Sequence, residues 1–362
     1  MRAWSGAIGS SVVVLAMVAC GGSSPPAQTG GATSPAGSAT ASVQPLPEPE
    51  QAAPEGPPSA EVAAGLQAFD AGNFADARKS FEAATQKNPK DYSAFVDLGQ
   101  TCEKLGDKAA AEAAYKSALG IKPDLESATA ELSSLYAQDG RVDEALQLAK
   151  TALAKHPGSA PLHESLGIAL ASRGDQEGAT SEFEQAIKLA PTDPMLHYTF
   201  ACWLNTWHVR GAAPHLDAAL TLIKPDDYAM IVSIGDAYRL AGEPDQCVKT
   251  LDRALKMKDR AEPRTYRALC KLALKDEQGT VDDLQAAVAK EPSYAPAHYY
   301  LAGRLAIARH FREAAAEYAK YLELEPSGPL APQASARLKM AQDAAAHQKG
   351  GKAPKASKKT TK

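Results

Sequence analysis

The sequence predicts an all-α protein in which helical hairpins stack into a solenoid. Three observations lead to this prediction. Prolines recur every 34 residues, small residues fall into fixed columns between them, and apolar residues within a repeat are spaced three and four apart. The prolines that mark the first periods are Pro89, Pro123, Pro157 and Pro191. A repeat of this length is one supersecondary unit that buries its apolar surface against its neighbours.

The second repeat shows why each period is expected to be a hairpin. Its first half carries one apolar stripe at helical spacing, formed by Phe95, Leu98, Cys102 and Leu105. Gly106 follows, and a glycine after the last helical turn takes the left-handed conformation that closes helices. The second half repeats the helical spacing until Pro123, which cannot continue a helix.

Small residues occupy the positions where the two helices of a hairpin are expected to cross. One column falls in the first helices, and it holds Gly65, Gly99, Gly167 and Gly235. A second column falls in the second helices, and it holds Ala77, Ala111, Ala145 and Ala179. Protein interiors are close-packed, so small side chains in both helices let the helix axes approach closely.

Together, the period, the small columns and the closing proline resemble the tetratricopeptide repeat. The resemblance implies a right-handed superhelical solenoid of about eight units over residues 58–326, with a capping helix at 327–348. Units are expected to begin near Pro58, Tyr92, Glu126, Ala160, Pro194, Tyr228, Ala261 and Ala295. The fifth unit contains Pro214, which a helix tolerates if it starts near Ala212. The seventh lacks the glycine between its helices.

Residues 1–19 are typical of a signal peptide, with one positive charge followed by a short apolar run. The run ends in Met17-Val18-Ala19-Cys20, which resembles the lipobox of bacterial lipoproteins. That resemblance implies lipid on Cys20, export, and anchoring to a bacterial membrane, most simply the periplasmic side of the outer membrane. The alternative is an ordinary cleaved signal peptide with an incidental cysteine.

Both flanks of the repeat region have the composition of disordered chain. Residues 20–57 are rich in Pro, Gly, Ser and Ala and are expected to form a tether. Residues 349–362 carry six lysines and no acidic residue. The tail lacks the arginines and aromatic residues of a nucleic-acid site, so no nucleic-acid partner is expected.

Catalytic chemistry is not predicted. The sequence has no phosphate-binding glycine loop, nucleophile elbow or His-Glu-x-x-His motif, so we expect no catalytic residue, metal, cofactor or small-molecule substrate. Cys247 falls in the small column and is expected to pack there, while pairing among the cysteines is left open. His163, His197 and His298 share one repeat position, which favours a packing role.

The family resemblance also implies a concave groove lined by the fifth and ninth residues of each unit. The groove residues expected on this basis are Val62, Val96, Ile168, Val232 and Tyr299. The fifth unit is the expected hot spot, with Tyr198, Cys202, Trp203 and Trp207. The alternative for these aromatic residues is filling of the core.

These observations favour a non-catalytic, membrane-tethered scaffold that binds other proteins of the bacterial cell envelope through its concave surface. Two alternatives are a regulatory subunit of a cell-wall enzyme and a structural spacer. In the spacer, the lysine-rich tail would contact an anionic envelope surface.

Overall fold

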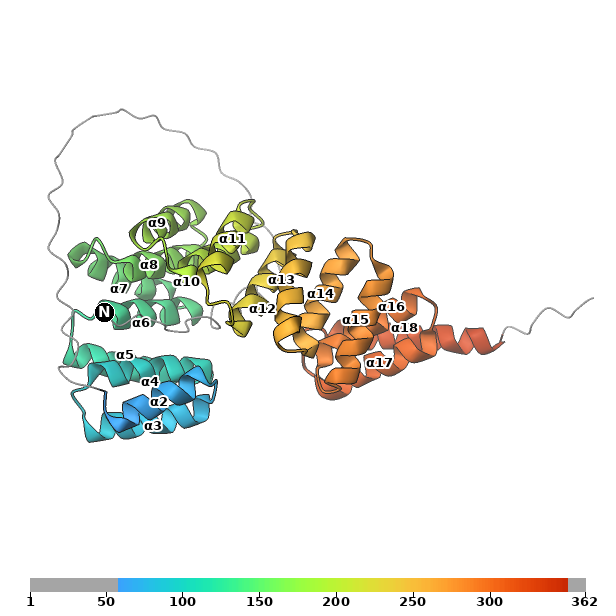
Figure 1. The fold of residues 1–362 in the computed structure, drawn as a ribbon, viewed down its shortest axis with the longest axis horizontal. Coiled ribbons are helices and arrows are strands. Elements are labelled where there is room, and N and C mark those ends of the chain that lie inside the picture. The colour runs from blue at the N-terminus through green and yellow to red at the C-terminus, as the bar shows by residue number, and fades with distance from the viewer. Residues whose placement is uncertain (1–57, 351–362) are drawn as a thin grey trace, which may run out of the picture. The chain divides into compact units, whose positions relative to one another are not determined.

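The computed structural model describes residues 58–350, which form seventeen α-helices and no β-strand (Figure 1). The all-α fold of stacked helical hairpins is therefore confirmed for these residues. The expected signal peptide, Cys20, the tether and the lysine-rich tail lie outside the residues whose side chains are described.

Eight hairpins follow one another along the chain. Their first helices are α2 (Ala60–Asp70), α4 (Tyr92–Lys104), α6 (Glu126–Gln138), α8 (Ala160–Arg173), α10 (Pro194–Thr206), α12 (Tyr228–Leu240), α14 (Ala261–Ala273) and α16 (Ala295–Ile307). Their second helices are α3 (Phe74–Lys87), α5 (Lys108–Ile121), α7 (Val142–Lys155), α9 (Gln176–Leu189), α11 (Ala212–Leu222), α13 (Pro244–Met257), α15 (Glu277–Lys290) and α17 (Phe311–Leu324). Seven of the eight first helices begin at the residue expected from the repeat, and α2 begins two residues late.

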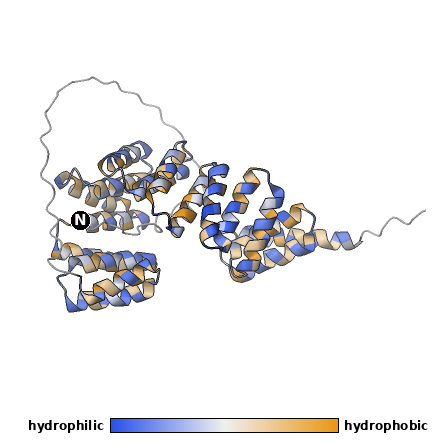
Figure 2. Cartoon of the chain, viewed as in Figure 1, coloured by the Kyte–Doolittle hydropathy of each residue, from blue (hydrophilic) through white to orange (hydrophobic). Residues whose placement is uncertain are grey.

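The chain forms two compact units, divided after Thr192. Among the described residues the N-terminal unit holds α2 to α9 and the C-terminal unit holds α10 to α18. Within each unit the two helices of a hairpin pack against each other and against the next hairpin. Hydrophobic and hydrophilic residues are interspersed along the helices (Figure 2), as stacked amphipathic helices require.

Local signals fix where the helices begin and end. Asp107 caps α5, because its carboxylate accepts a hydrogen bond from the Ala110 N–H at 3.1 Å. Pro123 comes directly after Lys122, which closes α5. Pro157 and Pro191 likewise follow the closing residues of α7 and α9, and Pro89 follows that of α3.

The small columns lie where helices cross. Ala77, Ala111, Ala145 and Ala179 are all 0% exposed. Each glycine of the first-helix column faces a large side chain of the second helix: Gly65 faces Phe81, Gly99 faces Tyr115, Gly167 faces Phe183 and Gly235 faces Leu251. A Cβ atom on Gly99 would lie 2.7 Å from Tyr115 Cδ1, inside van der Waals contact. The ring therefore occupies space that only glycine leaves open.

The two ends of the C-terminal unit depart from the repeat. In the fifth hairpin α11 begins at Ala212, so Pro214 falls in its first turn, where a proline is tolerated. At the other end, α18 (Ala331–Gly350) packs on α17. Its Ala331 and Ala334 join a buried cluster with Tyr299 and Tyr321. The expected capping helix at 327–348 thus begins at 331 and runs to 350. None of the described helices combines the length and the apolar character that a membrane span needs.

Candidate protein-binding faces

The first helices in each unit present one stripe of side chains away from their own second helices. It is formed by the sixth, ninth, twelfth and thirteenth residues of each repeat, which share one side of the helix at spacings of three and four. We call this the first-helix face. Its chemistry differs between the two units, which gives the chain two distinct candidate faces.

In the N-terminal unit the first-helix face is polar and acidic. Asp97, Gln100, Glu103 and Lys104 come from α4, and Glu131 comes from α6. Gln100 Nε2 donates a hydrogen bond to Glu131 Oε1 at 2.9 Å, which ties the two helices together. Tyr115 Oη donates to Glu103 Oε1 at 2.5 Å. We call this set the acidic patch.

Burial makes the acidic patch easy to protonate. It raises the pKa of Asp97 to about 7 and that of Glu131 to about 7. Burial also raises the pKa of Glu103 to about 7, with a further contribution from the negative charge of Glu131. The pKa of Lys104 is lowered by the same burial. The patch therefore changes its charge near neutral pH.

In the C-terminal unit the first-helix face carries tyrosines around an arginine. Arg239 on α12 pairs with the buried Asp236, with Nε and Oδ1 2.6 Å apart. Its guanidinium carbon lies 5.8 Å from the centre of the Tyr266 ring, within cation–π range. Tyr266 also contacts Tyr294, which precedes α16, and Tyr300 lies beside them. We call Arg239, Tyr266, Tyr294 and Tyr300 the tyrosine cluster, and each of them is half-buried.

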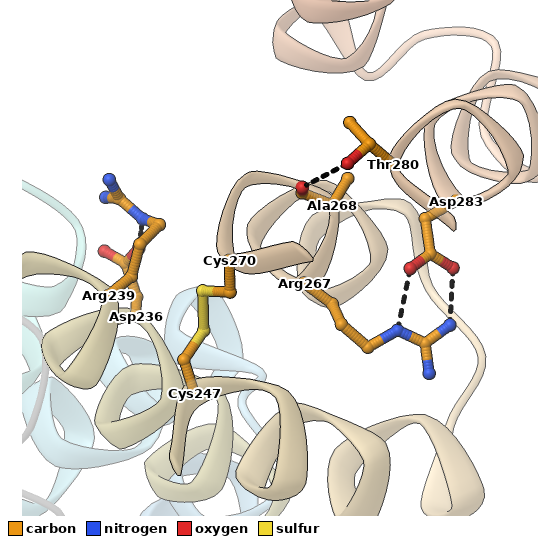
Figure 3. The surroundings of a disulfide bond; sticks show 8 residues. All are labelled: Asp236, Arg239, Cys247, Arg267, Ala268, Cys270, Thr280 and Asp283. Atoms are coloured by element: carbon orange, nitrogen blue, oxygen red, sulfur yellow. Dashed lines mark hydrogen bonds and ion pairs between the residues drawn. A yellow bond between two sulfur atoms is a disulfide. The ribbon is translucent and has the colours of Figure 1, made fainter. Parts of the chain in front are cut away.

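A disulfide joins two helices of the same unit (Figure 3). Cys247 on α13 is bonded to Cys270 on α14, with Cα atoms 6.3 Å apart. Both side chains are 0% exposed. Cys247 thus packs in the small column as expected, and the pairing that the sequence left open joins it to Cys270. The two cysteines are 23 positions apart and form no short paired motif, so the sequence pattern does not reveal the bond.

An ion-pair network lies on the far side of α14 from the disulfide (Figure 3). Asp283 on α15 is 3% exposed and accepts a hydrogen bond from Arg267 Nε at 2.8 Å. Lys271 Nζ lies 2.8 Å from the same oxygen, Asp283 Oδ2. Burial raises the pKa of this carboxyl group, but the hydrogen bonds from Arg267 and Lys271 outweigh it and hold the pKa below its ordinary value. The network and the disulfide together fix α14, which carries Tyr266.

Most residues expected in the groove lie in the core. Val62, Ile168, Val232, Tyr198, Trp203 and Tyr299 are buried, with 2–8% of their surface exposed. Val96, Cys202 and Trp207 are half-buried. The Trp203 and Trp207 rings lie 5.8 Å apart, so the pair does share one side of α10. A substitution such as Tyr198→Ala would therefore act through packing, and a role of these residues in binding stays a prediction.

Tyr266 and Tyr300 were missed because of a shift of one position. They are the sixth residues of their repeats, whereas the groove was expected from the fifth and ninth residues. One residue rotates a side chain by about 100° around a helix. The fifth residues, such as Val232 and Tyr299, consequently face the neighbouring helices. Tyrosine at the sixth position of two successive repeats is the signal that identifies this face.

The shared histidine position has a hydrogen-bonding role. His163 Nδ1 lies 2.6 Å from Glu182 Oε2, and His163 Nε2 lies 3.1 Å from the Pro157 carbonyl oxygen. His197 instead contacts His215, with their Nδ1 atoms 3.2 Å apart. Across residues 58–348, no three His, Cys, Asp or Glu side chains are placed to hold a metal ion together.

Comparison with protein families gives a match to the tetratricopeptide repeat over residues 62–126 and again over 131–194. Cellulose synthase operon protein C of Xanthomonas axonopodis pv. citri (strain 306) is 29% identical over 214 residues, which cover 59% of this chain and 12% of that protein. Protein FlbA of Caulobacter vibrioides is 26% identical over 162 residues, covering 44% of this chain and 27% of FlbA. The chain thus spans a small part of the length of these relatives.

Two solved structures share the fold. The Cut9–Hcn1 hetero-tetramer of the APC/C has a TM-score of 0.53 at 14% identity, covering 78% of this chain and 55% of that one. Yeast Tom70 has a TM-score of 0.53 at 16% identity, covering 80% of this chain and 64% of Tom70. At such low identity these matches support the arrangement of helices alone.

Proposed function

Because the chain is a tetratricopeptide-repeat protein, we propose that it is exported, tethered by lipid on Cys20, and holds other proteins of the bacterial cell envelope together. The repeats make it a protein–protein interaction scaffold. The tether, the compartment and the envelope partners are the proposed part.

The observation that carries the binding role is the half-buried tyrosine cluster on the first-helix face of the C-terminal unit. Tyrosine and arginine are enriched among the residues that contribute most to binding at protein interfaces. Asp236 and the disulfide-linked α14 already hold Arg239 and Tyr266 in place. A partner therefore meets side chains whose conformational entropy has largely been lost in folding, which favours affinity.

The Cys247–Cys270 disulfide supports export. Disulfides persist in oxidising compartments such as the bacterial periplasm and are rare in the bacterial cytosol. It lies in the folded repeats, so its support is independent of the sequence at residues 1–20. Two relatives, from Xanthomonas and Caulobacter, are bacterial proteins, which fits a bacterial host for the lipobox.

Photocrosslinking in cells tests the binding role. A photoreactive phenylalanine analogue replaces Tyr300, and in a matched control it replaces Lys249, an exposed residue of α13 in the same unit. We expect a defined set of envelope proteins to crosslink at position 300 and not at position 249. Equal capture at both positions, or none at position 300, would remove the support for this face.

Fractionation of the same cells tests the tether and the compartment. The parent protein should sediment with membranes. A Cys20→Ala protein has no lipid anchor and should be found in the soluble fraction. Alkylation before and after reduction should show Cys247 and Cys270 protected until reductant is added. Free thiols at both positions in freshly quenched cells would argue for a reducing compartment.

A further inference from the structure

The turns between the two helices of the last three hairpins expose large apolar side chains. Leu240 ends α12 and is 52% exposed, Leu274 follows α14 at 42%, and Ile307 ends α16 at 68%. Leu240 and Ile307 are the thirteenth residues of their repeats and Leu274 is the fourteenth, at the ends of the first helices of three successive hairpins in the C-terminal unit. We call this row, with the turn residues that follow it, the turn edge.

The same turns contain residues in an unfavourable backbone conformation. Glycine occupies the left-handed position in five other hairpins, at Gly72, Gly106, Gly140, Gly174 and Gly242, with φ from 75° to 88°. In the seventh and eighth hairpins this position holds Lys275 at φ 64° and Arg309 at φ 63°. A residue with a side chain is strained in the left-handed conformation, so glycine suits this turn. The fifth hairpin also departs from glycine here, with His208 at φ 54°, but only the seventh and eighth hairpins place a cation at this position.

The charges around the turn edge leave these two cations available. Asp276 accepts a hydrogen bond from the Gly279 N–H at 2.9 Å, and Glu277 lies 3.6 Å from Arg304 Nη1. Glu313 lies 3.3 Å from His310 Nδ1. Lys275 and Arg309 are both exposed, and neither forms an ion pair within residues 58–348. The neighbouring carboxylates thus have partners within this chain, whereas Lys275 and Arg309 form no ion pair in the described part of it. The turn edge is therefore complementary to negatively charged groups of a partner.

The spacing of the row suits a helix as partner. The first helices α12, α14 and α16 contact one another in turn, and packed helices lie about 8–10 Å apart. Seven residues of a partner helix advance about 10 Å at 1.5 Å per residue. One apolar side chain in every seven would therefore meet Leu240, Leu274 and Ile307 in succession.

We propose that the turn edge binds an amphipathic α-helix of a partner protein, with apolar residues about seven apart and carboxylates beside them. This inference rests on the proposed scaffold function and specifies the chemistry of one partner. Among its described residues the N-terminal unit offers no such row: Leu105 at the end of α4 is 42% exposed, but polar Asp139 and Arg173 stand at the equivalent ends of α6 and α8. Glycine fills every left-handed position in that unit.

The test uses the full-length protein and a fluorescent helical peptide with leucine at every seventh position and glutamate on either side of each leucine. A second peptide has lysine in place of every glutamate. Three proteins are compared by fluorescence anisotropy: the parent, Lys275→Gly with Arg309→Gly, and Leu274→Ser with Ile307→Ser. Vesicles of anionic phosphatidylglycerol provide a separate arm.

We expect the acidic peptide to bind the parent, and either double variant to weaken binding roughly tenfold. The glycine variant should be at least as stable as the parent, because glycine relieves the left-handed strain, so lost binding could not come from unfolding. Equal binding of both peptides, or undiminished binding by the glycine variant, would overturn the proposal. Vesicle binding without peptide binding would assign the edge to a membrane surface. If envelope proteins still crosslink at position 300 in any of these cases, the proposed scaffold function keeps its support.

Discussion

His298 and Glu317 connect the two helices of the last hairpin, with His298 Nδ1 and Glu317 Oε2 2.5 Å apart. The other ring nitrogen of His298 lies 2.9 Å from the Pro292 carbonyl oxygen, in the turn that precedes the hairpin. His163, Glu182 and Pro157 repeat the arrangement in the fourth hairpin. One imidazole thus holds a turn and a second helix against the first helix.

This contact predicts a pH dependence of stability in the C-terminal unit. The hydrogen bond to Glu317 raises the pKa of His298 above its ordinary value. The stabilisation is complete below the ordinary pKa of about 6.5 and is lost as pH rises through the raised pKa of the folded protein. We expect the parent to lose stability over this range relative to His298→Gln. Urea unfolding at a series of pH values measures this, and parallel curves for the two proteins would contradict it.

The glycine column predicts unequal effects of one substitution at two sites. A Cβ on Gly99 would lie 2.7 Å from Tyr115 Cδ1, whereas a Cβ on Gly167 would lie 3.2 Å from Phe183 Cδ1. Alanine gains up to about 1 kcal/mol over glycine within a helix. Overpacking costs about 1–3 kcal/mol. Gly99→Ala should therefore destabilise the N-terminal unit, and Gly167→Ala should change its stability by less than 1 kcal/mol.

Thermal or urea unfolding of these two variants provides the comparison. Each variant serves as the control for the other, since both add one methyl group inside the same unit. Equal loss of stability at the two sites would show that the ring of Tyr115 moves aside without cost.

The disulfide predicts that reductant weakens the C-terminal unit. A crosslink that closes a loop of this size stabilises a protein by about 3 kcal/mol, mainly by restricting the unfolded chain. We expect a lower unfolding midpoint for the parent in reductant. The Cys247→Ala, Cys270→Ala variant should unfold at the same midpoint with and without reductant. If reductant leaves the unfolding midpoint of the parent unchanged as well, the disulfide contributes nothing to stability.

The acidic patch predicts that lowering the pH stabilises the N-terminal unit. Burial raises the pKa of Glu131 to about 7, so its ionised form destabilises the folded state. The folded protein binds more protons between pH about 4.5 and 7, and stability falls with rising pH across that window. Glu131→Gln should raise stability at pH 8 by on the order of 2 kcal/mol and flatten the curve. A variant that is less stable than the parent at pH 8 would show that the ionised carboxylate is favoured by Gln100.

The sequence alone predicts most of the architecture because the repeat is a local pattern. The helical spacing, the small columns and the closing prolines all act within about 34 residues, so the starts of seven first helices could be read from it. The position of Pro214 in the first turn of α11 follows from the same reasoning.

The candidate faces depended on the tertiary structure. A repeat period fixes which residues share a side of a helix, but packing against the neighbouring hairpins decides how each helix is rotated. That rotation buries Tyr299 and leaves Tyr300 half-exposed. The Cys247–Cys270 bond and the pairing of Asp283 with Arg267 join different helices. Such contacts form only when the whole stack is assembled, so no local pattern in the sequence could specify them.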